Sequence, residues 1–356
     1  MSRILEHQFE KEVPEIISSW FDGDKGKVSF ERRKTNSRRK TDLTQKTHGY
    51  TFVVEWKAAG TTGLIADAIK NIKKLVIEIG DDTLIPIIAV PFMGEAGRKL
   101  CEEAHISWLD LSGNAHVTGP GLRIQIEGKP NKFKSVGRPR NVFAPKSSRI
   151  AREFLINPEI ALTQRELAKK TRLNETMVGR IVRELERENL LTRNKQSNAV
   201  RAQRPDLLLD AWRENYQFDK HSIIYGFSAQ RTGEATMRFI AEELEANKIE
   251  YAATGLAGAW LLAHFAAFRT ATFYLKEIPS PNLLKELKIT GQSKNGGNVW
   301  LVVPNDEGVF EEISMREHIR CAHPVQVYLD LKEQPERSSE AADAVRRECL
   351  NWGNVE

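Results

Sequence analysis

The chain has 356 residues, of which 40% are hydrophobic and 28% are charged, and its formal net charge is +5. This length predicts two or three globular domains. No apolar run approaches the roughly 18 residues that cross a bilayer, and residues 1–20 are too charged for a secretion signal, so we expect a cytoplasmic protein without membrane contact. The three cysteines (Cys101, Cys321 and Cys349) are too far apart to indicate a disulfide framework or a zinc site.

The charge is distributed unevenly along the chain. Residues 1–128 contain 18 Lys+Arg and 18 Asp+Glu, residues 129–213 contain 20 and 9, and residues 214–356 contain 15 and 21. The middle part therefore carries the entire basic excess. A basic segment between a neutral and an acidic one is typical of a module that contacts DNA.

These changes in net charge along the chain, together with the alternation of predicted helices and strands, predict a multidomain α/β (α+β) protein. We expect an α/β domain at residues 1–128 and a basic linker, rich in Gly and Pro, at residues 129–143. A DNA-binding domain at residues 144–210 and a second α/β domain at residues 211–356 follow.

The first domain is predicted to begin with an amphipathic helix over residues 1–20. Its remaining elements are predicted as strands at Lys27–Phe30, Arg39–Thr44 and Thr51–Trp56, a helix at 63–78, a buried strand at Leu84–Val90, a helix at Glu95–Glu103, and strands at Ser107–Leu111 and Leu122–Ile126. Gly113 and Asn114 are expected to form a structural hairpin turn.

Three residues of this domain can serve metal chemistry. Glu55 and Lys57 lie two apart in a predicted strand and therefore share a face, and a hairpin can bring Asp42 beside them. The two carboxylates, with the carbonyl of Trp56, would form a hard oxygen site for Mg²⁺. Lys57 would orient or deprotonate the attacking water and balance charge on a phosphate.

The element order and the pattern of Asp42, Glu55 and Lys57 resemble the restriction-endonuclease-like PD-(D/E)xK fold. The resemblance implies metal-dependent DNA cleavage, although Thr41 stands where the family often has Pro. A carboxylate of the first helix sometimes joins such a site, and here the choice among Glu6, Glu10 and Glu12 stays open. The alternatives are an ordinary strand pair, or a fold that survives as an inactive binding scaffold.

The middle part has the pattern of a helix-turn-helix. Thr163 and Glu166 have the spacing of a capping box before a helix at residues 164–171. Asn174 is expected to cap a second helix, whose apolar residues recur at helical spacing. A helix at Ser147–Ile156 precedes them, and two short strands at Leu190–Arg193 and Val200–Arg204 follow as a wing.

The second helix is expected to enter the major groove, with its N-terminal residues at base edges. The helix at Ser147–Ile156 could take a phosphate at its N-terminus. This part resembles the winged helices of bacterial MarR-like regulators, and its alternative is a three-helix protein-interaction module. The residues expected at DNA are Ser148, Arg149, Gln164, Glu175, Thr176, Gly179, Arg180, Arg183, Lys195 and Arg201.

The last domain is predicted to contain helices and strands in alternation, with strands at Asn298–Val303 and Val325–Leu331 and a final helix at Ser338–Arg347. The pieces YAATGLAGAWLLA and HPVQVYLDLKEQPERSSEAADAVRREC resemble AbiE-type antitoxin regulators of type IV toxin–antitoxin systems. That resemblance implies a distant likeness to nucleotidyltransferases. No Asp-x-Asp follows Gly255, and Asp330 stands alone, so we expect a non-catalytic domain for dimerisation or partner binding.

Two functions fit these features. The first is a sequence-specific regulator of the antitoxin type, which binds double-stranded DNA as a homodimer on a palindrome and a toxin-like protein through its acidic C-terminal domain. The second is an endonuclease of a defence or mobile-element system, targeted by the winged helix and using Mg²⁺ at Asp42, Glu55 and Lys57. A scaffold in a larger DNA-processing complex is a third. The first function needs no cofactor.

Overall fold

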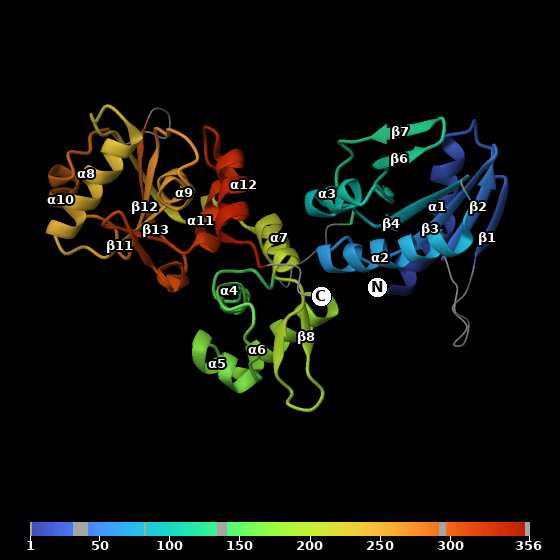
Figure 1. Cartoon of the computed structure of the whole chain (residues 1–356), viewed down its shortest axis with the longest axis horizontal. Coiled ribbons are helices and arrows are strands. Elements are labelled where there is room, and N and C mark those ends of the chain that lie inside the picture. The colour runs from blue at the N-terminus through green and yellow to red at the C-terminus, as the bar shows by residue number, and fades with distance from the viewer. Residues whose placement is uncertain (1, 31–41, 82, 134–140, 292–296, 353–356) are drawn as a thin grey trace. The chain divides into compact units, whose positions relative to one another are not determined.

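The computed structural model describes residues 2–30, 42–81, 83–133, 141–291 and 297–352 (Figure 1). The chain divides into two compact units. The first consists of Met1–Arg140 with Arg187–Leu190, and the second of Asn141–Glu186 with Leu191–Glu356. The boundary expected between residues 210 and 211 falls inside a helix of the second unit, α7 (Pro205–Asn215).

The first unit is built on a seven-stranded sheet with the order β1-β2-β3-β4-β5-β6-β7. The pairs β3–β4 and β4–β5 are parallel, and the other neighbours are antiparallel. Its elements are α1 (Ser2–Ser19), β1 (Lys27–Phe30), β2 (Leu43–Thr47), β3 (Tyr50–Trp56), α2 (Thr62–Ile79), β4 (Leu84–Val90), α3 (Glu95–Glu103), β5 (Ser107–Asp110), β6 (Ala115–Gly119) and β7 (Leu122–Ile126).

Helices cover both faces of this sheet. Phe9 and Val13 of α1 pack with Val54 of β3 on one face. Ile65 of α2 packs with Ile88 of β4 on the other face, which α3 also covers. Burial on both sides explains why β4 is a nearly continuous apolar run rather than an alternating one.

The predicted elements of this unit are largely confirmed. β1, α3, β4 and β7 have the predicted bounds, and the expected turn is present, with Gly113 at a φ of 102°. β2 begins at Leu43, while Arg39–Thr41 lie outside the described residues. β6 was not predicted from the sequence, because Ala115 and Gly119 at its ends disfavour a strand, and pairing with β5 and β7 holds it in the sheet.

The second unit begins with three helices and a two-stranded antiparallel ribbon: α4 (Ser148–Ile156), α5 (Gln164–Thr171), α6 (Glu175–Arg187), β8 (Leu191–Arg193) and β9 (Val200–Ala202). Both predicted caps are present. Thr163 and Glu166 form a complete capping box on α5, and Asn174 Oδ1 accepts a hydrogen bond from the backbone N–H of Met177 at 2.8 Å. Val178 and Leu185 of α6 are fully buried, as helical spacing predicts.

The rest of the second unit contains a six-stranded mixed sheet with the order β10-β13-β12-β11-β15-β14. Figure 1 shows α8 and α10 on one side of it and α9, α11 and α12 on the other. After α7 the main elements are β10 (Ser222–Gly226), α8 (Gly233–Ala246), β11 (Tyr251–Thr254), α9 (Gly255–Ala263), β12 (Ala271–Leu275), α10 (Pro281–Glu286), β13 (Val299–Val303), β14 (Ser314–Arg316), β15 (Ile319–Cys321), α11 (Pro324–Asp330) and α12 (Ser338–Cys349).

The strand predicted at Val325–Leu331 is wrong, because these residues belong mainly to α11. The alternation of Val325, Val327 and Leu329 with polar residues resembles a half-buried strand. In the structure, however, every residue from Val325 to Asp330 is buried. The alternation of apolar and polar residues therefore does not mark a buried and an exposed face here. Pro324 at the first helical turn and a cap from His323 start the helix instead.

Replacing Thr163 with Ala should lower the free energy of unfolding by about 1 kcal/mol, because the backbone N–H of Glu166 loses its acceptor. Urea unfolding of the second unit, followed by circular dichroism, measures this change. Thr176→Ala, on the exposed surface of α6, is the control and should change it by less than about 0.5 kcal/mol. Equal effects of the two substitutions would contradict the role of the cap.

Candidate functional site

The β2–β3 hairpin brings Asp42 to the end of β3. Leu43 pairs with Val54, and the backbone N–H of Asp42 donates to the carbonyl of the same Val54 at 3.1 Å. Asp42 Oδ2 also accepts a hydrogen bond from the backbone N–H of Trp56 at 2.8 Å, which fixes this carboxylate against the end of β3.

Glu55 and Lys57 form an ion pair at the C-terminal end of β3. Lys57 Nζ lies 2.6 Å from Glu55 Oε1, and the side chains of Lys57 and Glu55 are only 14% and 11% exposed. An ion pair with so little exposure is costly to break from one side, because the remaining charge stays desolvated. The structure thus brings Glu55 and Lys57 together, while Asp42 contacts the backbone of the same strand at Val54 and Trp56.

The three residues do not by themselves complete a metal site. Asp42 and Glu55 supply the hard oxygen ligands that Mg²⁺ prefers, but Lys57 holds one of the Glu55 oxygens. Across the described ranges, no group of three or more His, Cys, Asp or Glu side chains is arranged to hold a metal ion. A metal would therefore need water or phosphate oxygens to complete its coordination.

The helix α1 lies on the opposite face of the sheet from Glu55. Its Phe9 stacks on Trp56, with ring centroids 4.9 Å apart, and Trp56 alternates with Glu55 along β3. This position does not favour any of the three carboxylates of α1 that were considered as ligands, which are Glu6, Glu10 and Glu12.

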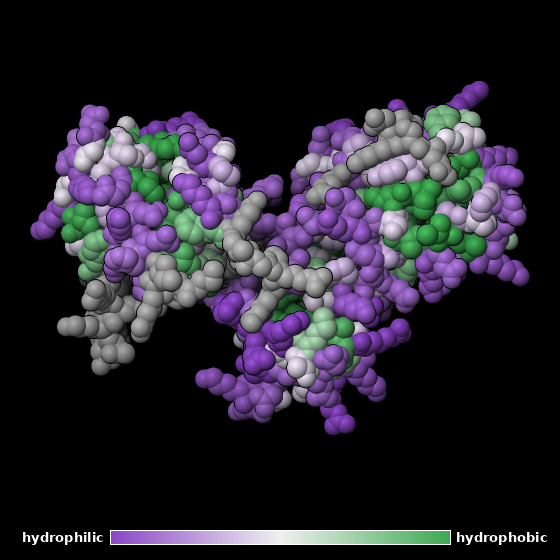
Figure 2. Space-filling model, turned by 180° about the vertical axis from the view of Figure 1, so that it is seen from behind, coloured by the Kyte–Doolittle hydropathy of each residue, from purple (hydrophilic) through white to green (hydrophobic). Residues whose placement is uncertain are grey.

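In the second unit, six of the ten residues expected at DNA are exposed on α6 or on the β8–β9 ribbon. No carboxylate among the described residues lies within ion-pair distance of the four basic side chains of this set. Figure 2 shows mostly hydrophilic residues over this segment, at the bottom of the view. The six residues are Glu175, Thr176, Arg180, Arg183, Lys195 and Arg201.

Gly179 is buried, so the expectation that it faces outward is wrong. A Cβ at this position would lie 3.1 Å from Oε1 of Gln164. The glycine therefore leaves room for the half-buried side chain of Gln164, the first residue of α5, which packs against α6 at this position. Helical spacing could not reveal this, because glycine has no side chain that marks its face.

Ser148 and Arg149 are engaged within the second unit. The Ser148 hydroxyl donates to the carbonyl of Pro145 at 2.7 Å, and its side chain is buried. Arg149 donates from Nε and Nη2 to the Asp306 carboxylate at 2.7–3.0 Å, and this partner raises the pKa of Arg149. Neither side chain is on the free surface.

The ribbon is anchored to α6 by a bidentate ion pair. Arg193 Nε and Nη2 contact the two oxygens of Glu186 at 2.9 and 3.0 Å, and Nη1 donates to the carbonyl of Asn198 at 3.0 Å. Asn194 Oδ1 accepts from two backbone N–H groups of the turn. Arg193 thus orients the ribbon, while Lys195 at its tip stays exposed.

A buried polar network around Asp330 was missed by the sequence analysis. Asp330 is fully buried, and its Oδ1 accepts from Gln326 Nε2 at 2.7 Å and Tyr274 Oη at 2.9 Å, and also from Tyr216 Oη. Thr254 Oγ1 donates to Oδ2. Four donors fit an ionised carboxylate, while burial raises the pKa of Asp330 to about 6.

This network continues to α4 through a buried arginine. Arg152 is 4% exposed, and its Nη2 donates to Oε1 of Gln326 at 2.6 Å. Its guanidinium lies 5.1 Å from the ring centroid of Trp212 in α7. Gln326 therefore bridges a buried cation on α4 and the buried carboxylate of Asp330, four residues further along α11.

Burial also keeps two histidines neutral. Burial, together with the positive charge of Arg152, lowers the pKa of His221 and of His323 to about 4. His221 Nδ1 accepts from the backbone N–H of Asn305 at 3.1 Å, so its proton belongs on Nε2, which faces Tyr216 Oη at 2.9 Å. The order from His221 to Tyr216 to Asp330 is a continuous hydrogen-bonded chain.

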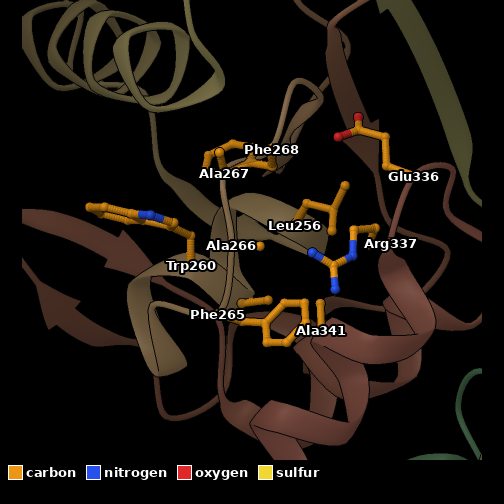
Figure 3. Close-up of a pocket in the computed structure, with 10 residues that line it drawn as sticks. Leu256, Trp260, Phe265, Ala266, Ala267, Phe268, Glu336, Arg337 and Ala341 are labelled. Atoms are coloured by element: carbon orange, nitrogen blue, oxygen red, sulfur yellow. The ribbon is translucent and has the colours of Figure 1, made fainter.

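The cavity of Figure 3, about 150 Å³ in volume, lies between α9, the segment after it and α12. Figure 3 shows Arg337 beside Phe265, and its guanidinium is 5.1 Å from that ring centroid and paired with Glu340. The Glu336 carboxylate accepts from the backbone N–H groups of Arg269 and Thr270. The charged groups at this cavity are therefore already satisfied.

Residues 201–351 match the family described as transcriptional regulator, AbiEi antitoxin, of the type IV toxin–antitoxin system. This confirms the predicted resemblance for that region, which covers less than half of the chain. Neither the curated proteins nor the solved structures contain a significant match. None of the described helices is both long and apolar enough to cross a membrane.

The two histidines predict a stability that falls in acid. Below pH 6.5 the unfolded chain binds protons at His221 and His323, whereas the folded chain does so only near pH 4, so each removes about 2–3 kcal/mol between these values. Asp330 has the opposite effect on stability. Its raised pKa means that, as the pH falls, the folded chain binds this proton before the unfolded chain does, which offsets the loss caused by one of the histidines.

His221→Gln should therefore flatten the loss of unfolding free energy between pH 6.5 and pH 4.5, measured by urea titration. His318→Gln, at an exposed histidine of the same unit, is the control and should keep the wild-type profile. An unchanged profile in the His221 variant would show that this histidine titrates normally in the folded chain.

Proposed function

We propose that this chain is a DNA-binding transcriptional regulator of the antitoxin type. The observation that carries the proposal is an exposed basic surface on α6 and the β8–β9 ribbon, next in sequence to a region that matches an antitoxin regulator family. We interpret α4–α6 and the ribbon as a winged helix-turn-helix. The capping box, the left-handed residue Arg172 after α5 and the cap at Asn174 support this interpretation.

In this proposal α6 lies in the major groove. Thr176 and Arg180, one turn apart on its exposed side, reach base edges, where Arg180 can donate two hydrogen bonds to a guanine. Arg183 of α6, Lys195 at the ribbon tip and Arg201 of β9 contact phosphates. Arg149 and Ser148 are left out of the interface, because the second unit already engages both.

The proposal extends to partners. A homodimer on a palindromic operator would double the number of phosphate contacts and set the spacing of the half-sites. The C-terminal part, residues 205–351, would contact a toxin-like protein, as the description of the matching family suggests. DNA binding of this kind requires no cofactor.

Arg180→Ala should weaken binding of the full chain to its operator by about 5- to 150-fold, because a bidentate base contact contributes roughly 1–3 kcal/mol. Fluorescence anisotropy with a duplex from the region upstream of the gene measures the affinity. Lys195→Ala should weaken binding evenly across sequences and reduce the slope of log affinity against log salt by about 1.

Arg231→Ala provides the matched control, because it removes one exposed positive charge outside the proposed interface. It should leave the operator affinity within about twofold, since a single distant charge is largely screened. The proposal fails if Arg180→Ala behaves like Arg231→Ala, or if affinity does not respond to salt.

We also propose a second candidate function, metal-dependent DNA cleavage by the first unit. We interpret its α-β-β-β-α-β core as restriction-endonuclease-like. The contact of Asp42 with the backbone at the end of β3, next to the Glu55–Lys57 ion pair, supports this candidate. Bound Mg²⁺ would supply Lewis-acid activation of water and phosphate. Asp42 and Glu55 would hold the ion, and Lys57 would turn from Glu55 to the phosphate.

If this candidate is correct, the full chain nicks or linearises supercoiled plasmid in Mg²⁺ or Mn²⁺, and Glu55→Gln reduces the rate at least about 100-fold, because one metal ligand loses its charge. Glu103→Gln, at an exposed glutamate of α3, is the control with the same chemical change. Plasmid that stays intact with either metal would identify the trio as a structural ion-pair cluster on an inactive scaffold.

A further inference from the structure

A cavity of about 290 Å³ lies in the second unit between α4, α7 and the segment that follows β13. This volume is at the lower end of the roughly 300–1,000 Å³ typical of small-ligand sites. Phe143 and Trp212 give it an aromatic wall, with nearly parallel rings 6.4 Å apart. Asn215, Gln217 and Asn305 add amide groups, which can bind a ligand without adding charge.

The charge at this cavity is unbalanced. Arg152, at its wall, has one hydrogen bond, from Nη2 to Gln326, while its Nε and Nη1 have no hydrogen-bond partner among the described residues. A buried guanidinium stays protonated, and leaving its donors unsatisfied is costly. Lys220, exposed at the cavity, adds a second positive charge.

The nearby carboxylates do not cancel this charge. Asp306 also lines the cavity, but both of its oxygens are held by Arg149. Asp330 reaches Arg152 only through the amide of Gln326. Glu311, whose charge also acts on Arg152, has an exposed side chain and no ion pair with it in the described part of the chain.

We propose that this cavity is a binding site for a small organic anion, with an aromatic or apolar body against Phe143 and Trp212 and a carboxylate or phosphate group directed at Arg152. The anion would supply the acceptors that Nε and Nη1 lack, and a charge-assisted hydrogen bond to a guanidinium is among the strongest available to a protein. Lys220 attracts the anion at the entrance.

Anion binding would act on the position of α4. The two unpartnered nitrogens expose essentially no surface, so the anion reaches them only if α4 or the segment after β13 moves. Gly308 in that segment fits closely, since a Cβ there would lie 3.3 Å from Arg152 Nε and 2.8 Å from Asp306 Oδ1. The same movement would loosen the Arg149–Asp306 ion pair, which holds α4 to that segment.

Isothermal titration calorimetry of the full chain with benzoate, phenyl phosphate and benzamide tests the site. The three probes share a ring, and only the first two carry a charge. At least one anion should bind, at least 10-fold more tightly than benzamide. A preference for benzoate or for phenyl phosphate identifies the anionic group. The proposal is overturned if neither anion binds, or if benzamide binds as tightly as both.

Two variants at the cavity and one control variant outside it separate the site from a loss of folding. Arg152→Gln should reduce the affinity for the anion at least 10-fold, but it also alters the buried network. Lys220→Ala, at an exposed residue, should reduce it about 2- to 5-fold, and Lys248→Ala, equally exposed but outside the cavity, should not change it. Equal affinity in the Lys220 and Lys248 variants, together with an unchanged Arg152→Gln, would place the anion elsewhere.

The effect on α4 is read from operator affinity with and without the anion at constant ionic strength, and this readout rests on the proposed function. A shift of at least 3-fold that disappears in Arg152→Gln is expected, and an unchanged affinity would refute the coupling. If the chain binds no operator at all, the proposed function fails, while calorimetry still decides on the anion site.

Discussion

The charge of Arg152 is the constraint on which the second unit depends. A guanidinium that is 4% exposed needs partners within the protein, and its one hydrogen bond goes to Gln326 of α11, whose amide also donates to Asp330. This requirement fixes α4 to the mixed sheet far more specifically than apolar packing would, because an amide and a carboxylate must both be in place. The three-helix segment and the α/β part are therefore one compact unit.

The two clusters of charge in the molecule differ in what they leave free. In the first unit, Lys57 satisfies Glu55, and Trp56 satisfies Asp42, so the cluster is stable without a ligand. In the second unit, the hydrogen bonds around Asp330 are complete, whereas those around Arg152 are not. The cluster of the first unit would bind a ligand only if that ligand, such as a metal ion, competes with its internal hydrogen bonds. The cluster around Arg152 has donors without a partner among the described residues, so it favours any anion that fits.

Local signals in the sequence predicted most elements, and long-range burial accounts for the errors. Thr163, Glu166 and Asn174 marked helix starts through their own side chains, so those helices were placed well. The strand expected around Val327 failed because an all-buried helix has no polar face. The pairing of Glu55 with Lys57 could be predicted because the period of a strand puts residues two apart on one face.

The residues around Arg152 and Asp330 could not be predicted in the same way. They come from α4, α7, β12 and α11, and no spacing in the chain connects them. Arg152 even belongs to the basic excess from which DNA contact was inferred, although it is buried. Counting charges along a sequence assigns every arginine to the surface, and only packing identifies those that are not there. The one signal in the sequence was the four-residue spacing of Gln326 and Asp330, which puts both on one face of a helix.

The ion pair between Arg149 and Asp306 has a consequence for how such a chain can be divided. A fragment cut between β9 and α7 would keep α4 but lose Asp306 and Gln326, the carboxylate and the amide that hold Arg149 and Arg152. Two arginines would then be released to solvent on a helix of nine residues. The isolated fragment would carry a cationic surface that the intact protein does not have, and its affinity for any polyanion would overstate that of the whole chain.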